Sequence, residues 1–173
     1  GVAEVDVADI IESVEELVRP LIDAKGLRYE RRCSRHGVMV RADRDKLQQI
    51  VLNLVSNAVK FTDSGGTVAI ECDRQNDAVC IRVADTGWGI PAEWLEYVFE
   101  PFTQVDSTRA RVAGGTGLGL TISRAFARGM GGELSVNSEP AKSSVFTVAL
   151  PSGECRTNDI TALPAGNVRM ARA

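Results

Sequence analysis

Three polar side chains interrupt an otherwise apolar segment of the sequence. Asn53, Asn57 and Lys60 are spaced four and three residues apart, so in a helix all three lie on one face. Burying carboxamides costs free energy unless they are hydrogen-bonded or hold a ligand. Amide oxygens suit Mg²⁺, and a lysine suits phosphate. Taken alone, this face is equally consistent with a metal and phosphate site and with side chains that cap neighbouring backbone.

A carboxylate stands between a strand-like segment and a glycine turn. Residues 83–91 read V-A-D-T-G-W-G-I-P, and the glycines at 87 and 89 permit close approach by a flat ligand. A buried carboxylate at Asp85 could accept a hydrogen bond from an exocyclic amine, which favours adenine over guanine. The alternative is an ordinary Asp-Thr-Gly turn.

A second glycine-rich segment precedes a predicted helix. Residues 114–120 read G-G-T-G-L-G-L. Backbone N–H groups and the positive end of the helix dipole could reach a phosphate chain there. The P-loop pattern and the strand–G-x-G-x-x-G–helix dinucleotide pattern are both absent.

The elements that must position these groups follow from periodicity and from turn residues. The predicted helices span residues 7–24, 44–61, 91–98 and 117–128. The predicted strands span residues 27–33, 38–41, 67–73, 78–84, 133–137 and 145–150. Asp43 is placed to cap the second helix, and Gly26 to end the first. We expect an α+β domain over 1–151, in which helices cover one face of a mixed, mostly antiparallel sheet, and a linker or tail over 152–173.

Composition narrows the class of protein. The 173 residues are 44% hydrophobic and 25% charged with a net charge of −3, which indicates one globular domain and gives no general attraction for nucleic acid or an anionic membrane. No apolar run approaches the roughly 18 residues that a membrane span needs. We expect a cytoplasmic domain without membrane contact, whatever anchors the parent chain.

The cysteines and the one histidine suggest neither a zinc site nor a catalytic triad. Cys33, Cys72, Cys80 and Cys155 form no C-x-x-C pair. Cys72 and Cys80 could face each other across a hairpin, but buried free thiols fit a reducing compartment better. His36 falls in a turn-like stretch without a following acidic residue, so we interpret it as a surface residue.

The ordered combination of motifs resembles the N, G1, F and G2 boxes of sensor histidine kinases. The four boxes correspond to L-x-x-I-V-L-N-L-V-S-N-A-V-K-F-T at 47–62, the turn at 83–91, V-F-E-P-F-T-Q at 98–104, and the glycine segment at 114–120. The resemblance runs from about Val5 to Pro151. It implies the two-layer α/β sandwich of the Bergerat (GHKL) type, with ATP and Mg²⁺ as ligands and a mobile ATP lid between Gln104 and Gly114.

The resemblance also implies roles for individual residues. Asn57 resembles the Mg²⁺ ligand, Asp85 the acceptor of the adenine amine, and Phe99 a brace at the root of the lid. The residues with implied catalytic roles are Asn53, Lys60 and Gln104. The other residues implied to contact the nucleotide are Phe61, Gly87, Gly89, Ile90, Phe102, Arg109, Gly115, Thr116, Gly117, Leu118, Gly119 and Leu120.

One position separates the branches of this superfamily. Members that hydrolyse ATP carry a glutamate four residues before the metal-binding asparagine, where it acts as a general base on water. Here that residue is Asn53, whose amide cannot take the proton. The resemblance therefore implies transfer of the γ-phosphoryl group to a histidine on a separate dimerisation domain, which this sequence does not contain.

Some positions depart from the family pattern. Gln104 leaves the cation at the transferring phosphate unassigned, with Arg109 and Arg111 as candidates. Trp88 is bulky for its place between the two glycines of the turn, and Ala141 and Ser143 stand where glycine is common.

These observations leave three functions open. The first is the ATP-binding catalytic domain of a two-component sensor kinase, with the parent's dimerisation helices and a response regulator receiver domain as partners. The second is a degenerate, nucleotide-responsive interaction module, and the third is a GHKL ATPase, which Asn53 disfavours.

Overall fold

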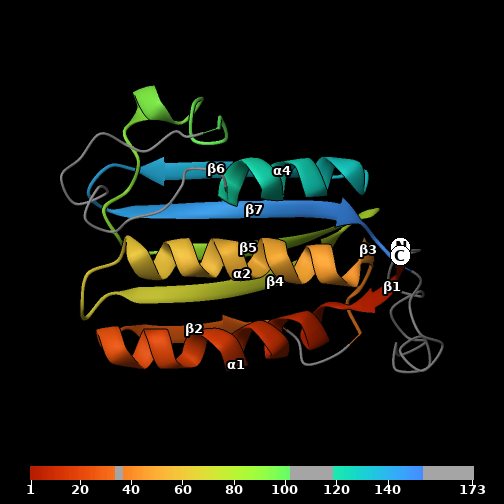
Figure 1. Cartoon of the computed structure of the whole chain (residues 1–173), viewed down its shortest axis with the longest axis horizontal. Coiled ribbons are helices and arrows are strands. Elements are labelled where there is room, and N and C mark those ends of the chain that lie inside the picture. Colours follow the sequence, from red (N-terminus) through yellow and green to blue (C-terminus); the bar gives the residue numbers. More distant parts are fainter. Residues whose placement is uncertain (34–36, 102–118, 154–173) are drawn as a thin grey trace, which may run out of the picture.

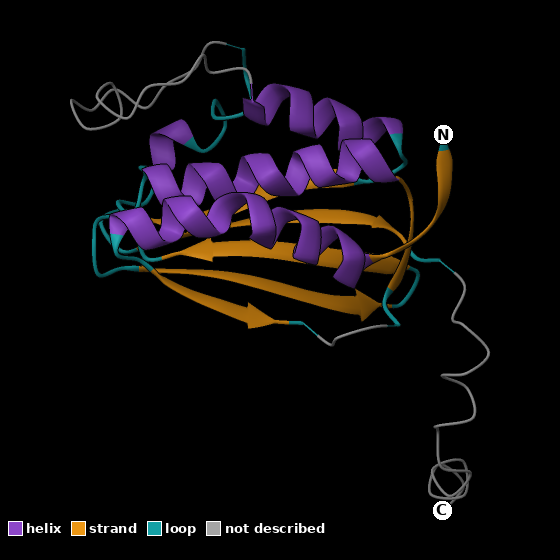
Figure 2. Ribbon diagram, turned by 60° about the horizontal axis from the view of Figure 1, so that its bottom comes forward, coloured by secondary structure: helices purple, strands orange, loops and turns teal. Residues whose placement is uncertain are grey.

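A five-stranded sheet carries three α-helices on one face in the computed structural model, which describes residues 1–33, 37–101 and 119–153 (Figures 1 and 2). The helices are α1 (Val7–Lys25), α2 (Arg44–Lys60) and α4 (Gly119–Gly129), with a short 3-10 helix η1 (Ala92–Trp94). The strands are β1 (Val2–Asp6), β2 (Arg28–Arg32), β3 (Met39–Asp43), β4 (Thr67–Gln75), β5 (Ala78–Asp85), β6 (Glu133–Glu139) and β7 (Ser143–Pro151). The expected two-layer fold is confirmed.

Capping residues fix both ends of helix α1. The Asp6 carboxylate accepts a hydrogen bond from the Ala8 N–H at 3.0 Å, which satisfies a backbone donor that the helix leaves unpaired. Gly26 ends the helix in the left-handed conformation with φ of 68°. Between these caps, Ile10, Ile11 and Val14 are fully buried against the sheet.

Helix α2 is the central helix and packs against both α1 and α4 (Figure 1). The predicted cap is confirmed, because Asp43 accepts from the N–H groups of Asp45 and Lys46. Leu47, Ile50 and Val51 are among its fully buried side chains. This packing fixes the rotation of the helix about its axis. Asn53, Asn57 and Lys60 therefore lie together on another face of α2.

The sheet is mixed and mostly antiparallel, as predicted, with the strand order β2-β4-β5-β7-β6. The pair β2 and β4 is parallel, and the other pairs are antiparallel. The β4–β5 hairpin sets Asp85 opposite Val68. The carboxylate therefore lies at the end of the sheet where β4 begins and β5 ends.

A second, two-stranded sheet joins β1 to β3. The sequence did not predict β1, because its residues are mostly exposed and its partner lies far away along the chain. The end of the chain's described part also joins this sheet: Ser152 bridges Val40, and the Gly153 N–H donates to the Met39 carbonyl at 2.7 Å. Residues 154–173 of the predicted tail lie outside the described residues.

The predicted helix at 91–98 is largely absent. Only η1 is helical there, and none of its residues is buried, whereas Val98 at the end of the stretch packs in the core. A turn in which Val98 N–H donates to the Trp94 carbonyl follows it. Across the described ranges, no helix is both long and apolar enough to cross a membrane.

Candidate nucleotide-binding site

Asp85 is a buried carboxylate, and only one of its two oxygens has a hydrogen-bond donor among the described residues. The residue is only 6% exposed. Oδ1 accepts a hydrogen bond from the Gly87 N–H at 2.9 Å, while Oδ2 has no donor within the described ranges. Burial raises the pKa of Asp85 from 3.8 to about 6, and the Gly87 N–H opposes this rise. A carboxylate held charged at neutral pH and half satisfied is suited to accept a hydrogen bond from a ligand.

We expect the Asp85 carboxyl to titrate near pH 6 in the nucleotide-free protein. Because the folded-state pKa lies above the unfolded one, the contribution of Asp85 to stability is fully present below about pH 4 and is lost as the pH rises through 6. Carboxyl-detected ¹³C NMR across pH 3–8 measures this value. A midpoint at or below 4 would contradict the desolvation of this side chain.

The glycines of the turn are required by protein backbone. A Cβ at Gly87 would lie 2.1 Å from the Phe61 carbonyl oxygen, and one at Gly89 would lie 2.1 Å from the Glu139 carbonyl oxygen. Gly89 also has φ of 68°. These glycines were expected to permit close approach by a flat ligand, but the space beside each Cα is filled by the chain itself. Their effect is to hold the turn against α2 and the β6–β7 end.

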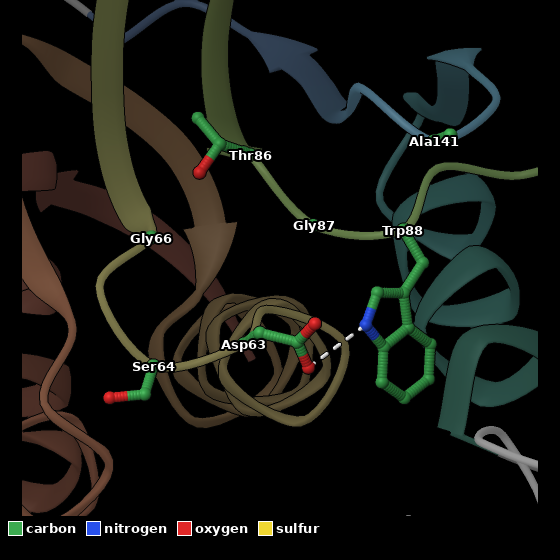
Figure 3. Close-up of a pocket in the computed structure, with 7 residues that line it drawn as sticks. All are labelled: Asp63, Ser64, Gly66, Thr86, Gly87, Trp88 and Ala141. Carbon is green, nitrogen blue, oxygen red and sulfur yellow. Dashed lines mark hydrogen bonds between the residues drawn. The ribbon is translucent and has the colours of Figure 1, made fainter.

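Phe61 and Trp88 tie the end of α2 to this turn. Their rings meet edge to face with centroids 5.6 Å apart, and the Trp88 N–H donates to the Phe61 carbonyl at 3.1 Å. The Trp88 indole N–H donates to Asp63 at 3.1 Å (Figure 3). Phe61 was singled out from the sequence, but nothing in the sequence indicated that Trp88 would bridge to Asp63.

A pocket of about 380 Å³ opens beside these residues (Figure 3). Its volume lies in the range of small-molecule sites. It is lined by Asp63, Ser64, Gly66, Thr86, Gly87, Trp88 and Ala141, of which the sequence analysis had assigned only Gly87 to the site. Thr86 is fixed by its hydroxyl, which accepts from the Thr67 N–H at 2.9 Å. Polar oxygen groups and one indole therefore converge at this end of the sheet.

Asn53 connects α2 to the start of α4. Its amide Nδ2 donates to the Ser123 hydroxyl at 3.0 Å, and a Cβ at Gly119 would lie 2.5 Å from the Asn53 Oδ1 atom. Gly119 thus lets the beginning of α4 approach the amide closely. Ser123 was not predicted as a site residue. It is buried, and its contact with Asn53 depends on how α4 packs against α2.

Asn57 and Lys60 lie on the same side of α2 with their polar ends available. Asn57 is half-buried and its carboxamide makes no hydrogen bond to any described residue, while Lys60 is exposed. Within the described ranges, no group of three His, Cys, Asp or Glu side chains could hold a metal by itself. A cation here would depend on the Asn57 amide oxygen together with phosphate oxygens of a ligand, and those donors suit Mg²⁺.

Two other predicted site residues are placed by the core. Ile90 and Leu120 both pack against it, and the Ile90 N–H donates to the Ser138 hydroxyl at 2.6 Å. The Phe99 ring packs against Phe146 with centroids 6.3 Å apart, and the Phe99 carbonyl accepts from the Thr121 hydroxyl at 2.8 Å. The predicted residues that lie outside the described ranges, as the expected lid does, are Phe102, Gln104, Arg109, Arg111, Gly115, Thr116, Gly117 and Leu118.

Comparison with known proteins identifies the family of this chain. Residues 42–154 match the family described as histidine kinase-, DNA gyrase B- and HSP90-like ATPase. The autoinducer 2 sensor kinase/phosphatase LuxQ of Vibrio vulnificus is 39% identical over 160 residues, covering 85% of this chain and 18% of LuxQ. The chain therefore spans less than a fifth of that relative.

Solved structures of two histidine kinases share the fold. The nucleotide-free catalytic domain of ThkA superposes with a TM-score of 0.77 at 27% identity, covering 87% of this chain and 97% of that domain. ThkA has also been solved in complex with the response regulator TrrA, with a TM-score of 0.73 at 25% identity, covering 88% and 42% of the two chains. Full-length ShkA in complex with AMPPNP gives 0.79 at 32% identity, covering 90% of this chain and 32% of ShkA. The chain thus belongs to the histidine kinase-, DNA gyrase B- and HSP90-like ATPase family and has the fold of a histidine kinase catalytic domain.

Proposed function

We propose that this chain is the ATP-binding catalytic domain of a two-component sensor histidine kinase, which binds Mg²⁺-ATP and donates the γ-phosphoryl group to a histidine on a separate dimerisation domain. The observation that carries the proposal is the half-satisfied, buried carboxylate of Asp85 between the end of α2 and the glycine turn.

Asp85 accounts for selection of adenine. The exocyclic amine of adenine can donate to Oδ2, which lacks a donor within the described ranges. Guanine presents a carbonyl at the corresponding place and would set two acceptors against each other. A hydrogen bond to a charged group contributes about 1.5–3 kcal/mol, so ATP is expected to bind at least tenfold more tightly than GTP.

Asn53 accounts for transfer to a protein nucleophile in preference to water. Its Nδ2 is committed to the Ser123 hydroxyl, and an amide cannot accept the proton of an attacking water. The γ-phosphoryl group is then held without a general base beside it. Phosphoryl transfer depends mainly on positioning and charge, so an incoming histidine at the right place can complete the reaction.

Asn57 and Lys60 are the described residues suited to the phosphate end of the nucleotide. Asn57 would hold Mg²⁺ through its free carboxamide oxygen, and the exposed ammonium of Lys60 would pair with phosphate oxygens. The metal supplies neutralisation of the charge on the phosphate oxygens. From the sequence, we also propose that Gln104, Arg109 or Arg111 contacts the transferring phosphoryl group.

The partners follow from the same reaction. The dimerisation helices of the parent kinase would supply the acceptor histidine, and a response regulator receiver domain would take the phosphoryl group from it. The complex of ThkA with TrrA supports the second partner, and the AMPPNP complex of ShkA supports nucleotide binding. The parent of this chain is expected to act in the cytoplasm.

The 173-residue chain alone is expected to bind ATP without labelling itself. After incubation with Mg²⁺ and γ-³²P-labelled ATP, the chain should stay unlabelled and release only trace phosphate. With the parent's dimerisation helices added, those helices should gain an acid-labile phosphate. His36→Gln should change neither result.

The same assay separates the other two functions. Rapid phosphate release by the chain alone would indicate an ATPase, and saturable nucleotide binding with no label on the added helices would indicate a degenerate interaction module. Either result would overturn the proposed kinase function.

A further inference from the structure

Two cysteines lie close together, far from the glycine turn: Cys33 directly follows the end of β2, and Cys72 lies on the neighbouring strand β4. The parallel pair β2 and β4 aligns Arg31 with Ile70 and Arg32 with Glu71, so the next step of the register brings Cys33 beside Cys72. Neighbouring strands lie about 4.8 Å apart, and disulfides join Cα atoms separated by about 4.4–6.8 Å. The backbone therefore already sets the two cysteines at a separation that a disulfide requires.

Both side chains point to the same face of the sheet. Cys33 has the same strand parity as Arg31, and Cys72 has that of Ile70, which is fully buried under the helices. Cys33 and Cys72 both pack against the edge of this core while remaining partly accessible. They can thus meet each other and can also be reached by a small reagent.

The third described cysteine is arranged differently. Cys80 is buried and pairs with Asp73 across the β4–β5 hairpin, whereas Cys72 is opposite Ile81. The less favoured alternative from the sequence, in which Cys72 and Cys80 face each other, does not hold, because the register offsets them by one residue and places them on opposite faces. The described cysteines are free thiols, as the sequence favoured. Cys80 is therefore an internal control for reactivity.

The surroundings distinguish the two thiols. The Cys33 thiol lies within 3.8 Å of the Ile70 carbonyl oxygen, an acceptor that favours its protonated form. The neighbouring Cys33 thiol lowers the pKa of Cys72, and the neighbouring Cys72 raises the pKa of Cys33. The Arg31 guanidinium lowers both pKa values. Its Nη2 atom is buried and has no hydrogen-bond partner among the described residues, so a positive group with unused donor capacity lies close to the pair. Cys72 is the better nucleophile of the two.

We propose that Cys33 and Cys72 form a redox-active dithiol that closes reversibly to an intramolecular disulfide by exchange with a small-molecule disulfide such as oxidised glutathione. The Cys72 thiolate attacks one glutathione sulfur, forms a mixed disulfide and releases one glutathione thiolate. Cys33 then loses its proton and attacks the Cys72 sulfur, which releases the second glutathione. The two protein thiols are oxidised and one glutathione disulfide is reduced to two thiols.

The described neighbours favour a disulfide over a metal site. No group of three metal-ligating side chains occurs within the described ranges, so the pair has no third ligand there. Cys72 lies five residues along β4 from Thr67, a rise of roughly 17 Å from the glycine turn. The proposal is thus independent of nucleotide binding.

Exposure of the whole chain to oxidised glutathione tests the proposal. A Cys155→Ser background removes the remaining cysteine, and peptide mapping by mass spectrometry without reductant identifies the products. We expect a Cys33–Cys72 cross-link in a monomeric chain that is lost on adding dithiothreitol, with Cys80 unmodified. ATP affinity should stay within twofold of the reduced chain.

Single substitutions test the order of the two steps. Cys33→Ser should stop at a stable glutathione adduct on Cys72, and Cys72→Ser should react at least tenfold more slowly at Cys33. Circular dichroism checks the fold of each variant, and the cross-link in the unsubstituted pair decides the matter if either variant fails to fold. Glutathione adducts on both cysteines without a cross-link, or unmodified thiols at saturating oxidant, would overturn the proposal.

Discussion

Asp85→Asn is expected to weaken ATP binding by about 10- to 100-fold, which corresponds to the roughly 1.5–3 kcal/mol of a hydrogen bond to a charged group. The asparagine oxygen can still accept from the Gly87 N–H, as Oδ1 of Asp85 does. Its NH₂ group would then replace Oδ2, which has no donor within the described ranges, and would point a donor at the adenine amine. The preference for ATP over GTP should shrink or reverse.

The same substitution should make the nucleotide-free protein more stable at neutral pH. Burial holds the pKa of Asp85 at about 6 against 3.8 in the unfolded chain, so the charged carboxylate costs the fold on the order of 2–3 kcal/mol at pH 7.5. A neutral amide avoids most of that cost, although its NH₂ group has no acceptor in the described part of the chain. We expect a gain of about 1–2 kcal/mol at pH 7.5 that disappears below pH 4.

Calorimetric titration with ATP and GTP, and urea unfolding at pH 3.5 and 7.5, measure both effects. Asp77→Asn is a matched control, because Asp77 is exposed at the β4–β5 turn. It should change neither quantity. Unchanged ATP affinity in Asp85→Asn would remove Asp85 from the nucleotide site, and lower stability at pH 7.5 would contradict the cost assigned to the buried charge.

Local signals in the sequence predicted most of the fold. The apolar stripe and the residues Asp43 and Gly26 defined α1 and α2 to within a few positions, because caps and helical periodicity are properties of neighbouring residues. Strand β1 was missed because its stability comes from pairing with β3, about 40 residues away. The helix expected at 91–98 failed for a related reason: an apolar pattern needs a surface to pack on, and η1 buries none of its residues.

The sequence supplied candidate residues for the site but not the contacts that hold them. Asn53, Phe61 and Asp85 were singled out from motif spacing. In the structure Asn53 lies within α2, Phe61 caps the end of α2, and Asp85 ends β5. Their partners Ser123 and Trp88 depend on how α4 and the glycine turn pack against α2, which no spacing along the chain encodes. The pairing of Cys33 with Cys72 was likewise hidden, because it follows from a parallel register between distant strands.

Gly87→Ala is expected to lower the unfolding free energy by about 1–3 kcal/mol, the usual cost of forcing an extra methyl group into a packed site. The new Cβ would lie 2.1 Å from the Phe61 carbonyl oxygen and 2.8 Å from the Asp85 Oδ1 atom. The first of these is backbone, which cannot rotate away as a flexible side chain can. The turn must therefore move off the end of α2.

That movement should also abolish tight nucleotide binding. The Gly87 N–H holds Asp85, and the Phe61 carbonyl accepts from Trp88, so displacing the turn disturbs both sides of the proposed adenine site at once. Gly129→Ala is the matched control, since no heavy atom beyond its chain neighbours and its own helix backbone lies within 4 Å of its Cβ position at the end of α4. It should leave ATP affinity unchanged and stabilise the protein by at most about 1 kcal/mol through helix propensity. Urea unfolding and ATP titration of both variants measure these effects. An unfolding free energy of Gly87→Ala within about 0.5 kcal/mol of the unsubstituted chain, the range of ordinary surface substitutions, would show that the turn can move without cost.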